Sequence, residues 1–69
     1  MDESPELRLL FHRLNNQLGI ILAHAELLEA KATDAMNRAR AAQVIASALE
    51  AMGTATEIRR QASTSPEPQ

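Results

Sequence analysis

The sequence predicts an all-α protein, an antiparallel two-helix hairpin that homodimerises into a four-helix bundle. Along its first half, apolar residues recur at alternating spacings of four and three, the period of a coiled-coil seam. The seam residues are Leu7, Phe11, Leu14, Leu18, Ile21, Ala25 and Leu28. After one short break, the second half again carries heptad-spaced apolar residues. Because 69 residues without cysteine bury too little as a lone hairpin, self-association is expected to complete the core.

The first predicted helix spans about residues 5–31, after a leader of residues 1–4. Ser4 can cap its N-terminus, Pro5 is tolerated in a first turn, and Glu6 complements the helix dipole. Further apolar residues widen the seam, namely Leu10, Ile20, Leu22 and Leu27. A stripe of this width is typical of a helix packed in a bundle.

A turn is predicted at about residues 32–33, followed by a second helix over about 34–62 that Asp34 can cap. Two neighbouring apolar stripes follow this helix, which indicates two partner helices. One stripe comprises Ala41, Val44, Ala48, Ala51, Ala55 and Ile58, and the other Ala42, Ile45, Leu49 and Met52. Because the connection is short, the helices should run antiparallel. Residues 63–69 have the composition of a disordered tail.

Composition argues against several classes of function. The net charge of -2 without a dominant basic face disfavours nucleic acid as a partner. No stretch approaches the roughly 18 apolar residues of a membrane span, and the acidic start does not resemble a signal peptide. We therefore expect a cytoplasmic protein without a membrane partner. There is no set of residues at metal-ligand spacing and no glycine-rich phosphate loop, so neither a metal nor another cofactor is expected.

His12 is the residue best suited to chemistry. An imidazole titrates near neutral pH and can accept a phosphoryl group or carry a proton. Asn15, Asn16 and Gly19 follow it by three, four and seven residues, so they share its side of a helix. A lone histidine on an amphipathic helix is more often an ordinary surface residue, and that interpretation stays open. His24 is interpreted as structural or exposed.

Four arginines are expected at the same end of the hairpin as His12. If the turn centres near residue 33, residues whose numbers sum to about 66 lie level across the two helices. The arginines are Arg8, Arg13, Arg59 and Arg60. Glu6 and Glu57 lie there too, so the field is mixed. Amides and guanidiniums around an imidazole could hold a phosphoryl group, or the active-site rim of a protein that carries one.

Residues 11–28, FHRLNNQLGIILAHAELL, resemble the phosphoacceptor helix of the dimerisation and histidine-phosphotransfer domain of sensor histidine kinases. Variants in that family read His-x-x-Asn-Asn-x-Leu, followed by an apolar stretch and Glu-Leu-Leu. The resemblance implies that His12 is the phosphoacceptor and that Asn16 orients a water against a partner's aspartyl phosphate. It also implies that Leu18 is the conserved apolar position after the motif. The second helix agrees with the family only in pattern and length.

Three departures from the family pattern matter. Arg13 stands where the family usually has an acid, and a guanidinium cannot act as a base. Gln17 replaces the usual proline, so the helix should be straighter there. Nothing after the second helix could form an ATP-binding domain, so a self-sufficient kinase is not expected. Transfer from an aspartyl phosphate is less affected, because a receiver domain supplies its own Mg²⁺.

Three functions remain open on these grounds. The leading one is a two-component-type signalling module that dimerises and docks a response-regulator receiver, with His12 acting in phosphotransfer or phosphatase chemistry. An alternative is a non-catalytic module that sequesters a receiver or pairs with a histidine kinase. The third is a purely structural oligomerisation hairpin. The candidate contacts to a partner or phosphate are Arg8, Arg13, Asn15, Gly19, Arg59 and Arg60.

Overall fold

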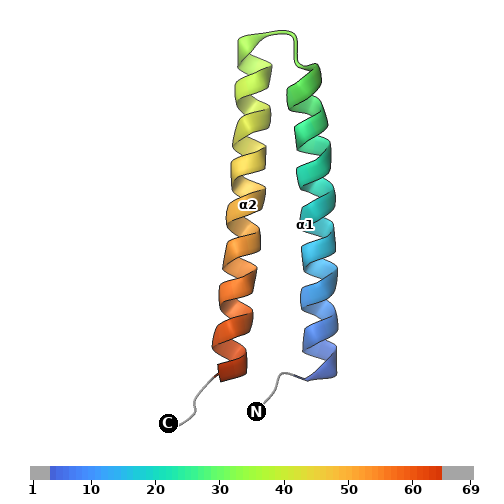
Figure 1. Ribbon diagram of the computed structural model, residues 1–69, viewed down its shortest axis with the longest axis vertical. Coiled ribbons are helices and arrows are strands. Elements are labelled where there is room, and N and C mark those ends of the chain that lie inside the picture. Colours follow the sequence, from blue (N-terminus) through green and yellow to red (C-terminus); the bar gives the residue numbers. More distant parts are fainter. Residues whose placement is uncertain (1–3, 65–69) are drawn as a thin grey trace.

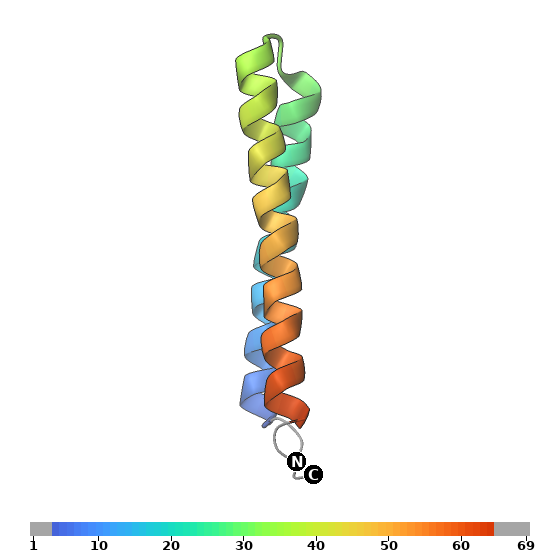
Figure 2. The ribbon, with the colours of Figure 1, turned by 90° about the vertical axis from the view of Figure 1, so that its left-hand side faces the viewer.

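The computed structural model describes residues 4–64, which form two helices lying side by side in one layer (Figure 1). Helix α1 spans Pro5–Lys31 and helix α2 spans Ala35–Thr64. The two helices run antiparallel, so that the first residues of α1 and the last residues of α2 share one end (Figure 1). Seen from the side, one helix lies behind the other (Figure 2). The predicted all-α hairpin is confirmed.

The hairpin is long and thin. Its Cα trace measures 53 × 21 × 9 Å, so the smallest dimension is about the width of a single helix. A single layer of two helices has two broad faces, and within residues 4–64 no third element covers either of them. Both broad faces are therefore left uncovered by the described residues.

Side-chain caps define the start of each helix. The Leu7 amide donates to Ser4 Oγ at 3.0 Å, which satisfies one of the unpaired amides in the first turn of α1. The Asn37 amide donates to Asp34 Oδ1 at 2.7 Å, and Asn37 Nδ2 donates to Asp34 Oδ2 at 2.9 Å. Asp34 therefore precedes α2 as its cap rather than forming its first helical residue.

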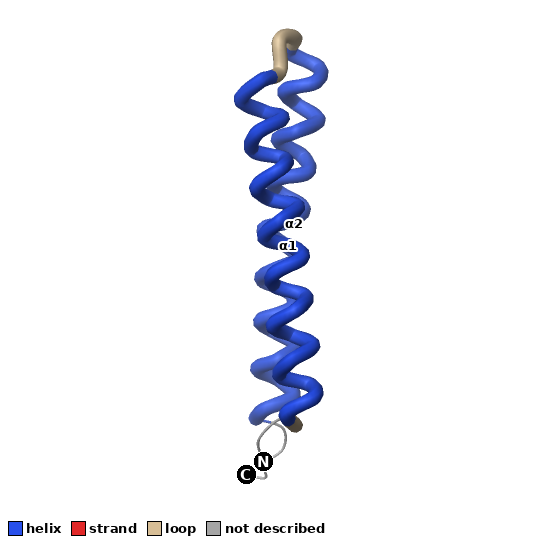
Figure 3. Tube along the Cα trace, turned by 90° about the vertical axis from the view of Figure 1, so that its right-hand side faces the viewer, coloured by secondary structure: helices blue, strands red, loops and turns tan. Residues whose placement is uncertain are grey.

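The connection between the helices is a tight turn, drawn in tan in Figure 3. The Arg38 guanidinium donates to the Ala32 carbonyl at 3.0 Å, so the first turn of α2 is tied back across the connection. This bond satisfies a carbonyl just past the end of α1 and holds the two helices antiparallel at this end.

Helix α2 ends later than the sequence predicted. Its last residue is Thr64, two residues beyond the predicted end at about residue 62. The nearest proline is Pro66, which restricts only the residue immediately before it, so the helical hydrogen bonds can continue to Thr64. Residues 1–3 of the expected leader and residues 65–69 of the expected tail lie outside the described residues.

Small side chains at a spacing of seven form the contact between the helices. The buried residues are Phe11 and Ala25 on α1, with Ala41, Ala48 and Ala55 on α2. Leu18, midway between the two on α1, is half-buried. These positions form pairs whose numbers sum to 66, namely Phe11 with Ala55, Leu18 with Ala48, and Ala25 with Ala41. That regularity fits a turn centred at residue 33, and alanine lets the helices approach closely.

The hairpin leaves half of the predicted seam uncovered. Leu14, Ile21 and Leu28 are 39%, 47% and 66% exposed, and on α2 Val44 and Ile58 are exposed as well. Within the described residues, the buried side chains are four alanines and one phenylalanine. Since burial of apolar area is the main stabilising term in folding, a core this small leaves most of the available stabilisation unused.

Candidate functional site

The burial of three consecutive residues shows which side of α1 faces α2 and which sides face outward. Phe11 is buried against α2, whereas Leu10 and His12 are both exposed. Successive residues of an α-helix are rotated by about 100°, so Leu10 and His12 lie on opposite sides of Phe11. The imidazole and the neighbouring leucine are therefore presented on opposite broad faces of the hairpin.

The face on the Leu10 side carries an apolar stripe along its length. The inward-facing positions, which face the other helix, are residues 11, 18 and 25 of α1 and residues 41, 48 and 55 of α2. On both helices, this face carries the residues three positions after them. We call it the apolar face, and it comprises Leu14, Ile21, Leu28, Val44, Ala51 and Ile58. Near the turn, a groove of about 310 Å³ is lined by both Leu28 and Val44, so the stripes of the two helices share one face. Lys31 and Arg40 also line this groove.

The opposite face carries His12. It comprises the residues that follow the inward-facing positions by one, and we call it the His12 face. Its members are His12, Gly19 and Glu26 on α1, with Ala42, Leu49 and Thr56 on α2. Gly19 is half-buried and the other five are exposed. An added Cβ at Gly19 would meet nothing within 4 Å, so the surface beside His12 is open on its turn side.

On α1, both apolar and polar residues surround His12. Arg8 lies one turn before it, and a shallow hollow of about 270 Å³ is lined by Pro5, Arg8, Leu9 and His12. One turn after it, Asn15 is half-buried towards α2 and Asn16 is exposed. The structure thus brings the imidazole close to one guanidinium, and the spacing sets two amides on the same side of the helix.

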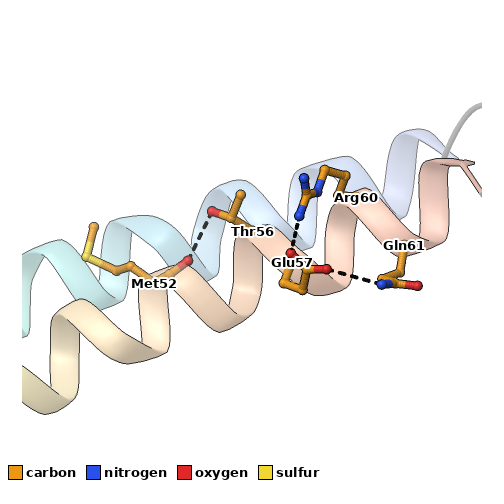
Figure 4. A network of polar contacts seen from close by, with 5 residues as sticks. All are labelled: Met52, Thr56, Glu57, Arg60 and Gln61. Carbon is orange, nitrogen blue, oxygen red and sulfur yellow. Dashed lines mark hydrogen bonds and ion pairs between the residues drawn. The ribbon is translucent and has the colours of Figure 1, made fainter.

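The other predicted arginines are less closely associated with His12. Arg13 is exposed, but it is rotated by about a further 100° from His12, away from α2. Arg60 forms an ion pair with Glu57 on α2 (Figure 4). Arg59 lies beside it on α2 and is exposed. The expected gathering of four guanidiniums is therefore looser than the sequence suggested.

Glu57 is the centre of a small polar network at the open end of α2 (Figure 4). Besides the pair with Arg60, its Oε2 accepts from Gln61 Nε2 at 3.1 Å. The hydrogen bonds from Arg60 and then Gln61 lower the pKa of the Glu57 carboxyl. Thr56 donates from its hydroxyl to the Met52 carbonyl at 3.0 Å. The charge of Arg60 is thus offset by a carboxylate, and the Thr56 hydroxyl is engaged within α2.

Within residues 4–64, no three histidine, cysteine, aspartate or glutamate side chains are grouped to hold a metal ion. Over the same residues, neither helix is long and apolar enough to cross a membrane. The chemistry available at the His12 face is therefore that of an exposed imidazole with neighbouring amide and guanidinium donors.

One residue of the His12 face was not predicted as part of it. Leu49, which the sequence assigns to a packing stripe of the second helix, is 53% exposed on this face of the hairpin. By the sum of residue numbers it lies level with residue 17, between His12 and Gly19. The signal that could have found it is its offset of one from Ala48, the same offset that His12 has from Phe11.

No family model matches the sequence, and no curated protein or solved structure matches the chain. Function is therefore inferred from the residues of the hairpin and their arrangement.

Proposed function

We propose that the protein is a dimeric signalling module that docks a receiver domain on the His12 face and accepts or removes its phosphoryl group. The observation that carries this proposal is the exposure of His12 on the broad face opposite the apolar face. One face can then be covered by a partner copy while the imidazole stays accessible. Residues 11–28 resemble a histidine-kinase phosphoacceptor helix, and this resemblance is the reason for proposing phosphoryl transfer as the chemistry of the exposed His12.

The occupant proposed for the apolar face is a second copy of the chain. Apolar residues occur in level pairs whose numbers sum to 65, namely Leu14 with Ala51 and Ile21 with Val44. Because both helices contribute at the same levels, the face is suited to pair with itself about a two-fold axis. Two hairpins packed in this way would form a four-helix bundle and bury the large side chains that the lone hairpin exposes.

In the proposed transfer, an imidazole nitrogen of His12 attacks the phosphorus of an aspartyl phosphate on the receiver. The N–P bond forms as the bond to the aspartate oxygen breaks, which releases the carboxylate. Arg8 can donate to the phosphoryl oxygens, whose Mg²⁺ comes from the receiver. In the phosphatase reaction, the amide of Asn16 would orient a water for the same attack.

The turn-side part of the His12 face offers a docking surface for the receiver. Gly19 leaves open space on α1, and the exposed Leu49 lies beside it on α2. An apolar helix of a receiver could pack against Leu49 and the open space at Gly19, and it would place the phosphoryl group towards His12.

The test is incubation of the purified full chain with receiver domains phosphorylated by acetyl phosphate. Phosphohistidine and the loss of aspartyl phosphate are followed over time. His12→Ala is expected to reduce both to background, whereas His24→Ala, on the same helix but off the His12 face, should behave as wild type. If the wild-type chain neither forms phosphohistidine nor accelerates dephosphorylation of any receiver, the proposal is wrong.

The second candidate is a non-catalytic module that binds a receiver or a histidine kinase. Arg13 favours it, because the family usually has an acid at this position. On this reading, His12→Ala leaves partner binding unchanged, whereas Leu49→Asp abolishes it. Since Leu49 is exposed, its replacement should not unfold the hairpin. A purely structural hairpin would tolerate both replacements without any change in partner binding.

A further inference from the structure

The groove near the turn differs from the rest of the apolar face, because two cations line it. We call it the turn groove. Its apolar wall includes Leu28 of α1 with Ala41 and Val44 of α2, and its cations are Lys31 and Arg40. A volume of about 310 Å³ lies at the lower end of the range for small-molecule sites, and apolar walls with a few polar groups are typical of such sites.

Neither cation of the turn groove is neutralised within the hairpin. Among residues 4–64, Lys31 and Arg40 form no ion pair. Arg40 Nη2 contacts Met36 Sδ at 4.0 Å, and a thioether sulfur is a weak, uncharged acceptor. On their own helices, the residues three and four positions from each cation include no carboxylate. Both charges are therefore available to an anion that enters the groove.

The carboxylates near the turn lie away from the groove. Glu26 belongs to the His12 face, and Glu29 is half-buried towards α2. Asp34 caps α2, and both of its oxygens accept from Asn37. With Arg38, this end of the hairpin carries as many cations as carboxylates, but only cations line the groove. The positive charge is thus local to the groove.

We propose that the turn groove binds a medium-chain aliphatic carboxylate. Its head group pairs with Lys31 and Arg40, and its alkyl chain lies against Leu28 and Val44. A carboxylate is favoured over a neutral or cationic head group, because the charged residues that line the groove are both cations. The site lies on the face that the proposed function assigns to a second copy. On that function, the ligand and the second copy compete for the groove.

The probe is octanoate, and its matched controls are octanamide and octylammonium, which keep the alkyl chain and change the charge of the head group. All are used below the concentrations at which they form micelles. In NMR spectra of the full chain, the amides of Leu28 and Val44 should show saturable shifts, and that of Leu49 on the His12 face should not. We expect octanoate to bind about fivefold to tenfold tighter than octanamide, since it gains two exposed ion pairs. Octylammonium should bind most weakly.

Chain length separates the turn groove from the apolar face as a whole. Affinity should rise by up to about fourfold for each methylene between butanoate and octanoate, and it should level off once the chain is longer than the groove. A continued rise to dodecanoate, with shifts that spread to Leu14 and Ile58, would overturn the site and indicate non-specific binding along the face.

Variants test the two parts of the site separately. Lys31→Gln combined with Arg40→Gln should remove the preference for octanoate over octanamide. Arg13→Gln, which removes an exposed cation on another side of α1, should preserve it. Val44→Gln should weaken binding of both probes, and because Val44 is exposed, helical content should be unchanged. Equal affinity of the wild-type chain for the three probes, a preference that persists in the double variant, or no saturable shift would overturn the proposal.

Sedimentation equilibrium separates this proposal from the proposed function. If the chain dimerises through the apolar face, the affinity for octanoate should fall as the protein concentration rises, and saturating octanoate should lower the mass towards that of one chain. If the chain is a monomer without ligand, the dimer of the proposed function is wrong, while selective binding of octanoate still supports the groove. A dimer that keeps its mass with octanoate bound would overturn the competition between ligand and second copy.

Discussion

Leu28 of α1 and Val44 of α2 line the same groove, so the outward apolar stripes of the two helices meet on one broad face. Both side chains are exposed in the hairpin. Each follows a buried alanine by three residues, Ala25 in α1 and Ala41 in α2. The same offset repeated along both helices produces a continuous apolar face, and it leaves the residues at an offset of one, including His12, on the other face.

Adjacent isoleucines provide a test of that face. Ile21→Asp should weaken the dimer by about 3 kcal/mol or more, because it buries an unpaired charge between two copies. Ile20→Asp changes the same residue type one position away, on the side of α1 that points away from α2, and should leave the dimer intact. Sedimentation equilibrium gives the mass of each variant. Equal behaviour of the two variants would contradict dimerisation through the apolar face.

The cap of α2 should contribute measurably to stability. Asp34→Ala removes the acceptor of the Asn37 amide and should lower the free energy of unfolding by about 1 kcal/mol. Urea denaturation followed by circular dichroism measures this change. Thr33→Ala, at the neighbouring turn residue, is the control and should have little effect. Unchanged stability of Asp34→Ala would mean that water replaces the carboxylate as a cap.

Close approach of the helices depends on small side chains at the inward positions of α2. Ala48→Leu should destabilise the hairpin by about 1–3 kcal/mol, since Ala48 is buried and the added atoms would force the helices apart. Ala46→Leu adds the same atoms at an exposed position of α2 and should change stability by less than about 0.5 kcal/mol. Thermal unfolding of both variants makes the comparison, and equal melting temperatures would argue against tight packing at Ala48.

The Glu57 network predicts a pH dependence at the open end of the hairpin. Because Arg60 and Gln61 lower the pKa of the Glu57 carboxyl, the stabilisation by this pair is present at neutral pH. It is lost as the pH falls through the lowered pKa, when the carboxylate is protonated. An NMR titration of the Glu57 side chain should show a midpoint that rises in Arg60→Gln. A midpoint unaffected by that replacement would mean that the ion pair does not persist in solution.

Much of the fold follows from local patterns in the sequence. The start of α1 is marked by Ser4 and Pro5, and the start of α2 by Asp34, because capping depends on residues a few positions apart. The heptad spacing predicts that both helices pack along a stripe. The last residues of α2 were harder to predict, because serine is typical of turns and helix termini, and the end of a helix is its least sharply defined part.

The candidate site was less predictable than the fold. The spacing of Asn15, Asn16 and Gly19 from His12 determines which residues share a helix side, and the sequence contains that information. Which flank of α1 becomes the apolar face depends on the direction in which α2 packs, and that is a tertiary property. For the same reason the sequence does not place Leu49 on the His12 face, because the inward direction of α2 is defined by Ala48 in the folded hairpin.

Residues that face each other across the hairpin have numbers with a constant sum, and this regular pairing restricts how the length of the hairpin can vary. A single residue added to one helix would rotate every later side chain by about 100° and move the imidazole to a different surface. Seven residues added to each helix at the same height would instead extend the rod by about 10 Å and preserve every existing neighbour. Natural relatives and engineered derivatives of this hairpin should therefore differ in length by paired heptads.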